Sequence, residues 1–179
     1  GDVTMWIDAG SVSLADAQVG GSIAVNGACL TATRLDGNAF AADVSRETLA
    51  VTTLGLAAPG TRVNIEKALL AGQALGGHYV TGHIDGVGNV ISRHDDARSV
   101  RVEFEVPDEL ARYVARKGSI CVDGVSLTVN GVNGRRFDVN LVPHTLELTT
   151  LASCGAGTRV NIEVDIIARY LERMLEAGR

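Results

Sequence analysis

Residues 21–31 read GSIAVNGACLT, and residues 118–128 read GSICVDGVSLT. The two stretches match position by position at an offset of 97 residues (118 minus 21). The same offset relates GTRVNIE at residues 60–66 to an identical GTRVNIE at residues 157–163. Self-similarity of this length indicates a tandem duplication of one small domain.

The duplication predicts the domain boundaries. We expect a first domain over residues 1–75, a second over residues 76–164 and a C-terminal helix over residues 165–179. Residues 76–98 of the second copy have no partner in front of the first copy, so the opening strand of the first copy is either missing or precedes this numbering. We favour the second interpretation, because a small β-domain that lacks a strand exposes an unpaired edge.

Strand and turn patterns predict an all-β fold. Residues 100–106, VRVEFEV, alternate apolar and charged side chains, which is typical of a strand with one face in water. Asn26-Gly27 and Asp123-Gly124 stand in the middle of the repeated stretches and favour the positive φ angles of a tight β-hairpin. Short strands at regular spacing, joined by glycine turns, predict a small barrel in each repeat.

The tail has a different pattern. The residues from Asp165 to Ala177 should form an amphipathic helix, because their apolar side chains recur every three to four residues. The apolar face can pack on its own barrel or on another subunit. We favour the subunit contact, because the helix is appended to complete barrels.

Composition excludes several classes of protein. Among 179 residues, 16 Lys and Arg face 21 Asp and Glu, and the net charge of −5 argues against a nucleic-acid binder. A hydrophobic fraction of 46% provides a core, and the apolar runs are far shorter than the roughly 20 residues that span a bilayer. No secretory signal pattern opens the sequence. Three cysteines without C-x-x-C spacing fit a reducing compartment, so we expect a cytoplasmic protein without a disulfide framework.

The alternation of polar and apolar side chains along the repeated hairpins indicates a candidate binding surface, since side chains two residues apart share a face of a strand. We call Cys29, Thr31 and Thr33 the first shelf, and Ser126, Thr128 and Asn130 the second shelf. The intervening apolar residues should face the core, which leaves each shelf outward and suited to a flat polar heterocycle. The alternative is that these side chains merely occupy a solvated strand face.

Two histidines and three differences between the repeats complete the set of candidate functional residues. His78 and His83 are five residues apart and should lie on opposite faces of a strand, which argues against a shared metal ion. A neutral His83 could accept a proton, although a hydrogen-bonded structural histidine is the alternative. Gly20, Cys29 and Glu47 of the first copy become Lys117, Ser126 and His144 in the second. One scaffold with different polar groups suits two sites with different tasks on related ligands.

Four ordered motifs carry a resemblance to a known family. They are NGACLT at residues 26–31, GGHYVTGHIDG at 76–86, DGVSLT at 123–128 and VPHTLE at 142–147. These motifs resemble the lumazine-binding repeats of the riboflavin synthases of the trimeric α-chain type, over essentially the whole chain. The resemblance implies two tandem six-stranded Greek-key barrels followed by a C-terminal trimerisation helix.

The reaction implied by the resemblance is a dismutation. Two molecules of 6,7-dimethyl-8-ribityllumazine react, and transfer of a four-carbon unit gives riboflavin and 5-amino-6-ribitylamino-pyrimidinedione. No cofactor and no metal are implied. The family's active site lies between the first barrel of one subunit and the second barrel of its neighbour in a homotrimer, and lumazine synthase is a candidate partner.

The resemblance also assigns site residues. Ser126 and His83 are candidates for proton transfer at the reacting methyl group, and Cys29 for assisting addition at the ring. The first site would be lined by Cys29, Leu30, Thr31, Asp43, Val44, Ser45, Arg46, Glu47 and Thr48. The second would be lined by Gly82, His83, Ile84, Lys117, Ser126, Leu127, Thr128, Val142, Pro143, His144, Thr145, Leu146 and Glu147. Arg46 stands where relatives often have proline, as at Pro143, which leaves the backbone there open.

Two rival functions remain. Lumazine and fluorescent antenna proteins resemble the same fold but bind a chromophore without turnover, and they are expected to lose the second polar set and the trimerising tail. This chain keeps Lys117, Ser126, Thr128 and His144, which favours the enzyme. A nucleic-acid-binding barrel would need a basic patch and stacking aromatic residues, and the sequence has neither.

Overall fold

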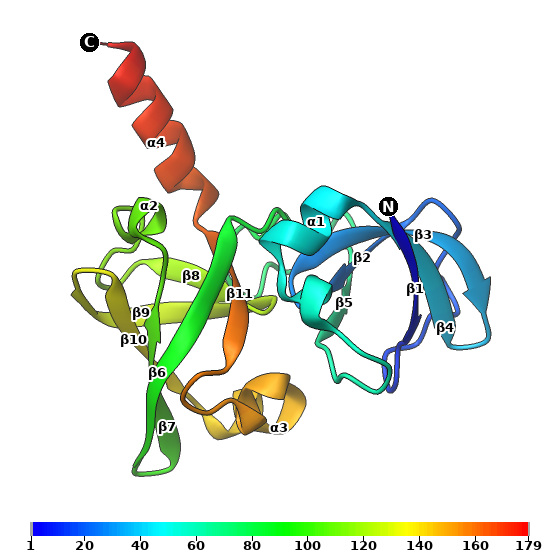
Figure 1. Cartoon of the computed structure of the whole chain (residues 1–179), viewed down its shortest axis with the longest axis horizontal. Coiled ribbons are helices and arrows are strands. Elements are labelled where there is room, and N and C mark those ends of the chain that lie inside the picture. Colours follow the sequence, from blue (N-terminus) through cyan, green and yellow to red (C-terminus); the bar gives the residue numbers. More distant parts are fainter. Residues whose placement is uncertain (1, 179) are drawn as a thin grey trace.

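Each sequence repeat builds its own β-sheet in the computed structural model, which describes residues 2–178 (Figure 1). The first sheet has five antiparallel strands in the order β1-β4-β3-β2-β5. Their bounds are β1 Val3–Asp8, β2 Ser22–Val25, β3 Ala28–Asp36, β4 Ala39–Val44 and β5 Ile65–Lys67.

The second repeat closes into a six-stranded antiparallel barrel in the order β10-β7-β6-β11-β8-β9. Its strands are β6 Gly86–Asp96, β7 Ser99–Glu105, β8 Ser119–Val122, β9 Val125–Asn133, β10 Arg136–Leu141 and β11 Arg159–Val164. The short helices are α1 Arg46–Val51, α2 Asp108–Ala111 and α3 Pro143–Leu148, with 3-10 turns at Thr53–Leu56 and Thr150–Ser153. The all-β fold of two repeats is therefore confirmed.

The two repeats differ at one strand. In the second barrel β6 lies between β7 and β11, whose repeat counterparts are β1 and β5. Within residues 2–178 no strand lies between β1 and β5, so the first repeat is an open sheet with these two strands as its edges. The six-stranded barrel expected for each repeat is present in the second, and the first has five strands within residues 2–178, as expected for a copy whose opening strand is missing or precedes this numbering.

Both repeats turn their hairpins in the predicted way. Asn26 and Gly27 have φ angles of 45° and 79°, and Asp123 and Gly124 have φ angles of 47° and 85°. Two consecutive positive φ angles match the twist of the flanking strands, and Asn, Asp and Gly reach this region at low cost. The turns therefore fix which side chains of the following strand face outward.

Each sheet encloses an apolar core. Phe104 and Phe137 stack in the second barrel, with ring centroids 5.3 Å apart, and both are buried. Phe40 is the largest fully buried side chain of the first sheet. Rings that large, each enclosed by Val, Leu and Ile, explain how the fold forms with few aromatic residues.

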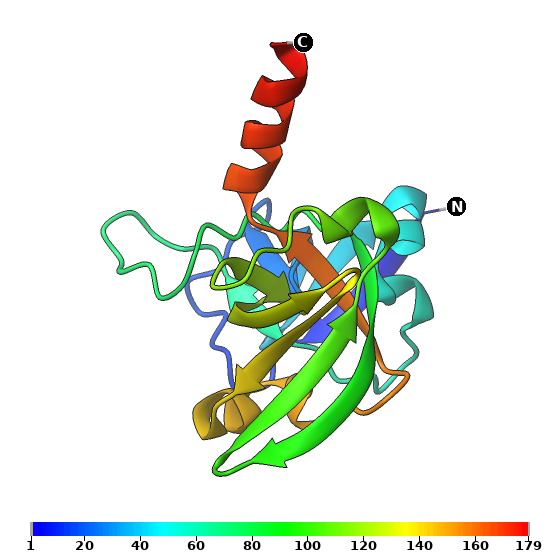
Figure 2. The same cartoon turned by 90° about the vertical axis from the view of Figure 1, so that its left-hand side faces the viewer.

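Helix α4, Ile166–Ala177, projects away from both sheets (Figures 1 and 2). The Asp165 side chain accepts a hydrogen bond from the Ile167 N–H at 3.0 Å and so caps its first turn. Its polar face touches the second barrel, where Glu172 binds Tyr113 and Arg112. The expected amphipathic helix is thus present.

A reciprocal exchange of hydrogen bonds joins the repeats. Asn161 of the second repeat accepts from the Thr53 N–H at 2.7 Å and donates to the Asn26 carbonyl at 2.8 Å. Its counterpart Asn64 accepts from the Thr150 N–H at 2.8 Å and donates to the Asp123 carbonyl at 2.9 Å. Each asparagine therefore crosses to the other repeat and uses both ends of its amide.

The hairpin turns meet at this junction, and one of them carries a buried acid. The Asp123 side chain accepts from the Asn161 N–H at 2.7 Å, as Asn26 does from the Asn64 N–H. Burial raises the pKa of Asp123 from 3.8 to about 7, although the Asn161 N–H opposes the shift. The folded protein therefore holds a proton at Asp123 over a pH range in which the unfolded chain does not.

We predict that Asp123→Asn raises stability at pH 8 by roughly 2–4 kcal/mol, because it removes the cost of burying a charged carboxylate. Between about pH 4 and pH 7 the folded state binds more protons than the unfolded state, so the Asp123 contribution to stability falls as pH rises. Asp123→Asn should remove this dependence of the free energy of unfolding on pH. Urea denaturation across this pH range measures it.

The matched control is Asn26→Asp, which places the acid at the equivalent turn of the first repeat. Asn26→Asp should add a similar fall in the free energy of unfolding between about pH 4 and pH 7, and it should lower stability at pH 8. Equal pH profiles for the wild type and Asp123→Asn would contradict the account of the junction.

Candidate functional site

The first shelf lies on the outer face of β3. Cys29 and Thr31 are exposed, and Thr33 is half-buried and donates to the Ala41 carbonyl at 3.2 Å. Leu30 and Ala32, the residues between them, are buried in the core. The predicted alternation of exposed and buried side chains is therefore present, and the Cys29 thiol and the Thr31 hydroxyl lie side by side at the surface.

The second shelf occupies the same place on β9. Ser126 and Thr128 are exposed, while Leu127 and Val129 are buried in the barrel core. Register keeps the shelves equivalent, because Ser126 pairs with Cys121 on β8 as Cys29 pairs with Ala24 on β2. Leu30, Leu127 and the buried Val44 can offer a ligand only their backbone groups.

The segments that follow β4 and β10 flank the shelves and have matching backbones. Ser45 begins α1 with φ −68° and ψ 157°, and Val142 begins α3 with φ −73° and ψ 158°. The Ser45 hydroxyl accepts from the Thr48 N–H at 3.1 Å, whereas Val142 has no such bond. Arg46 and Pro143 both take the first helical position, after N-cap residues with closely similar backbone angles.

The remaining predicted residues of these segments are exposed or half-buried. Asp43 accepts a hydrogen bond from the Thr4 hydroxyl at 2.6 Å. Thr145 and Leu146 are half-buried, and Leu146 packs against the second core. Four other side chains are exposed and free to meet a ligand, namely Glu47, Pro143, His144 and Glu147.

Lys117 has a φ angle of 67°, which is uncommon for a residue with a side chain. Its counterpart Gly20 has a φ angle of 89°, and both backbone N–H groups donate at 2.8 Å to a carbonyl of the second hairpin strand, Lys117 to Val129 on β9 and Gly20 to Ala32 on β3. The repeat thus imposes a glycine conformation on a lysine.

The connection between β5 and β6 crosses both shelves. The Gly82 carbonyl accepts from the Cys29 N–H at 2.9 Å, and a Cβ at Gly82 would lie 2.5 Å from the Cys29 Cβ. A Cβ at Gly77 would collide with the Ser126 side chain. Only glycine permits such close approach at these two points. One segment of the chain therefore touches the leading residue of each shelf.

A buried carboxylate anchors this connection. Glu163 on β11 is almost fully buried and accepts three hydrogen bonds, from the Thr81 N–H at 2.6 Å, the Thr81 hydroxyl at 2.7 Å and the Gly82 N–H at 3.0 Å. Its repeat counterpart Glu66 is exposed at the surface, although partial burial of its carboxyl group raises its pKa. The anchor thus exists in one repeat only.

The structure brings together some predicted residues and leaves others apart. Gly82 meets Cys29, but no hydrogen bond joins His83, Lys117 or His144 to a shelf among the described residues. The residue that bonds to Ser126 is His78, with Nδ1 2.8 Å from Oγ. From the sequence, His78 was considered only as a metal ligand, and its place in the motif GGHYVTGHIDG was the one signal that this segment could be functional.

The cysteines differ sharply in environment. Burial raises the pKa values of Cys121 and Cys154, which keeps both thiols protonated, while Cys29 is exposed. Within residues 2–178, no cluster of three His, Cys, Asp or Glu side chains could hold a metal ion. No helix in that range is long and apolar enough to cross a membrane.

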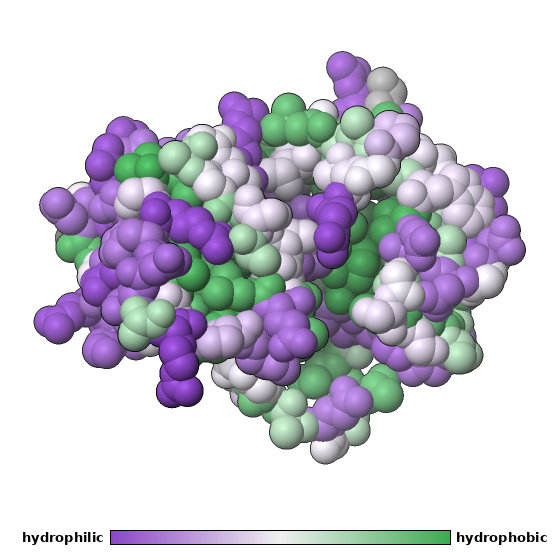
Figure 3. Space-filling model, turned by 90° about the horizontal axis from the view of Figure 1, so that it is seen from below, coloured by the Kyte–Doolittle hydropathy of each residue, from purple (hydrophilic) through white to green (hydrophobic). Residues whose placement is uncertain are grey.

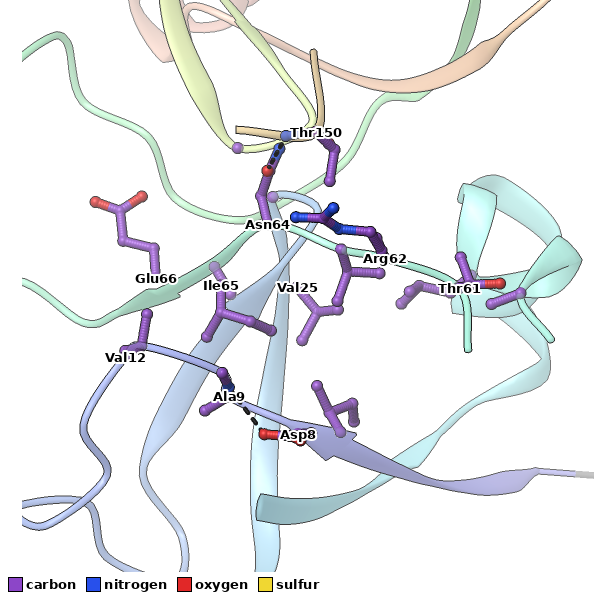
Figure 4. Close-up of a pocket in the computed structure, with 18 of the residues that line it drawn as sticks. Asp8, Ala9, Val12, Val25, Thr61, Arg62, Asn64, Ile65, Glu66 and Thr150 are labelled. Atoms are coloured by element: carbon purple, nitrogen blue, oxygen red, sulfur yellow. Dashed lines mark hydrogen bonds between the residues drawn. The ribbon is translucent and has the colours of Figure 1, made fainter. Parts of the chain in front are cut away.

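A cavity of about 1280 Å³ lies between β1, β5 and the loop 57–64 (Figure 4). Its lining extends to Ser126 of the second shelf and to Glu147. Val25 and Ile65 project toward it, while Asn64 turns away to bond with Thr150. Apolar surface also lies in recesses between polar rims on the lower face of the molecule (Figure 3).

This cavity corresponds to a strand position. In the second barrel β6 fills the equivalent place, and Val102, Val160 and Ile162 are fully buried beneath it. Their counterparts in the first repeat, Met5, Val63 and Ile65, are only half-buried. The cavity is also larger than the roughly 300–1,000 Å³ of typical small-molecule pockets. We regard the two shelves as the candidate site, and the cavity adjoins this site at Ser126.

Comparison with known proteins identifies the family. The family model described as "Lumazine binding domain" matches residues 2–68 and 81–165. The riboflavin synthase of Mycobacterium tuberculosis is 49% identical over 94% of this chain and 86% of its own length. The riboflavin synthase of Photobacterium phosphoreum is 45% identical over 97% of this chain and 80% of its own length. The chain belongs to the lumazine-binding family of riboflavin synthases.

A solved structure agrees with this family. LumP complexed with riboflavin superposes with a TM-score of 0.76 at 28% identity, covering 84% of this chain and 82% of that protein. The family model matches both repeats and leaves out residues 69–80, the first part of the connection that crosses the shelves. The duplicated lumazine-binding domain read from the sequence is therefore confirmed.

We predict that Glu163→Gln lowers the free energy of unfolding by about 1.5–3 kcal/mol, because an amide cannot accept from three donors as a carboxylate does. Urea denaturation measures the change. Glu66→Gln is the matched control at the same repeat position, and it should stay within about 0.5 kcal/mol of the wild type. Equal stabilities of the two variants would show that Glu163 is not an anchor.

Proposed function

We propose that this chain is a riboflavin synthase, a transferase that converts two molecules of 6,7-dimethyl-8-ribityllumazine into riboflavin and 5-amino-6-ribitylamino-pyrimidinedione. The observation that carries the proposal is the pair of equivalent shelves with different leading groups, a thiol at Cys29 and a hydroxyl at Ser126. A dismutation needs two copies of one substrate held in different chemical environments. The duplicated scaffold meets that need, because equivalent places on the two shelves hold Cys29 in one repeat and Ser126 in the other.

The main catalytic task is to hold two ring systems together in reacting geometry. Positioning two reactants in one site can contribute about 7–11 kcal/mol to lowering the barrier. Thr31 and Thr128 offer hydroxyl groups and the neighbouring strands offer backbone groups to the polar edge of each ring. No cofactor is needed, because the methyl group and the electrophilic ring of the substrate supply the reactive carbons.

Within this proposal the residues have separate roles. Ser126 and His83 move protons at the reacting methyl group, and Cys29 assists addition at the ring of the other lumazine. Three charged or polarisable side chains at the shelf margins, Lys117, His144 and Glu147, bind the ribityl hydroxyl groups. The two half-sites meet across subunits, with the first shelf of one chain facing the second shelf of its neighbour.

The proposed assembly is a homotrimer held by α4. The helix exposes a continuous apolar row, formed by Ile167, Tyr170, Leu171, Met174 and Leu175, each more than half exposed. A row of this length on a projecting helix is an unfavourable surface unless another chain covers it. We further propose a cytoplasmic location, and lumazine synthase, as the supplier of the substrate, for a partner.

We predict that purified protein incubated with the lumazine alone forms riboflavin, followed by its absorbance and fluorescence. Cys29→Ser should reduce kcat by roughly 10²-fold, because the hydroxyl is a poorer nucleophile and acid than the thiol at the same position. Full turnover by Cys29→Ser would remove Cys29 from the mechanism. Tight binding of lumazine without turnover by the wild type would favour the fluorescent antenna function instead.

For the assembly, we predict that Leu171→Glu lowers the molar mass in solution from that of a trimer to that of a monomer, measured by light scattering at micromolar concentration. The new carboxylate would have to be buried in the helix contact. Arg173→Glu changes a neighbouring exposed side chain of the same helix and should leave the mass unchanged. A monomeric wild type would contradict the proposed role of α4.

A further inference from the structure

The contact between His78 and Ser126 has no counterpart in the first repeat. His78 Nδ1 lies 2.8 Å from Ser126 Oγ, which is a good hydrogen-bond distance. At the first shelf, the same connection presents only the Gly82 backbone to Cys29. The second shelf thus has a side-chain partner that the first lacks, held in place by the anchored segment at Thr81 and Gly82.

The other nitrogen of the ring decides where its proton lies. His78 Nε2 is enclosed and has no hydrogen-bond partner among the described residues. A neutral imidazole carries its proton on one nitrogen and a lone pair on the other. An enclosed N–H without an acceptor is costly, and orphaned acceptors are tolerated more often than orphaned donors. The proton therefore belongs on Nδ1, and the lone pair on Nε2.

The surroundings support a neutral ring. Burial lowers the pKa of His78, and the negative charges of Asp165 and Glu163 oppose the shift. A neutral ring with its proton on Nδ1 donates to Ser126 Oγ. The hydroxyl proton of Ser126 is then not used inside the protein and is free to point outward from the exposed shelf.

We propose that His78 is a positioning residue that fixes Ser126 as an outward hydrogen-bond donor to an acceptor atom on the ring bound at the second shelf. The ligand class is a heterocycle that presents a carbonyl oxygen or an unprotonated ring nitrogen. This inference rests on the proposed function for the identity of the ligand. The second site is then selective for ligand atoms that accept a hydrogen bond. The first site lacks this selectivity, because the Cys29 thiol has no such partner and is a weak donor.

Fluorescence titration with the lumazine tests the contact. Ser126→Ala and His78→Ala should each weaken binding at the second site about tenfold, the equivalent of one hydrogen bond. The double variant should bind no more weakly than Ser126→Ala, because His78 acts through Ser126. His78→Asn should restore most of the affinity, since its amide N–H can donate from nearly the position of Nδ1. His94→Asn, an exposed histidine on β6, is the matched control.

The proton position is tested separately by ¹⁵N NMR of the imidazole ring in the full-length protein, which distinguishes the two neutral tautomers. A proton on Nδ1 supports the inference, and a proton on Nε2 overturns it. Additive losses in the double variant, or unchanged binding by His78→Ala, would also overturn it. A wild-type chain that binds no lumazine would contradict the proposed function, while the NMR result would still decide the state of His78.

Discussion

The exchange between Asn64 and Asn161 determines how the two repeats sit against each other. Apolar surfaces can slide with little change in energy, but a buried amide must meet both a donor and an acceptor at fixed distances. Asn161 has no exposed surface, and both ends of its amide bind the first repeat. Because Asn64 does the same in the opposite direction, only one relative orientation satisfies all four bonds.

That relative orientation of the repeats determines where the two shelves and the connection between β5 and β6 lie. The hairpin turns of the two repeats meet at Gly27 and Gly124, so the strands that follow, β3 and β9, start from one point. The connection from β5 to β6 can then cross both shelves within a few residues, from Ser126 to Cys29. A rotation at the junction would separate the shelves from the connection that touches them.

Duplication followed by local change explains the chemistry. The scaffold residues are kept in both copies, as GTRVNIE shows, while three paired positions diverge in charge or partner. Asp123 replaces Asn26 in the turn, Ser126 replaces Cys29 on the shelf, and Glu163 acquires donors that Glu66 lacks. The change in the turn leaves the backbone in place, since the φ angles of Asn26 and Asp123 are 45° and 47°.

Much of this was predictable from sequence where the signal is local. The Asn26-Gly27 and Asp123-Gly124 turns fix the register, and the register fixes which side chains of β3 and β9 face outward. The helix α4 follows from its apolar spacing. The contact between His78 and Ser126 was not predictable, because it joins residues 48 positions apart through a segment without periodic structure. The same holds for Glu163 and Thr81, since a carboxylate in an alternating strand shows no sign of its partners.

The central claim is that ligand binds on the outer faces of β3 and β9. The most direct measurement is a crystal structure of the protein grown with riboflavin. We predict that the ring lies against Thr31 on the first shelf or Thr128 on the second, within hydrogen-bonding distance of their hydroxyl groups. Riboflavin bound instead between β1 and β5, out of contact with Thr31, Ser126 and Thr128, would contradict this interpretation.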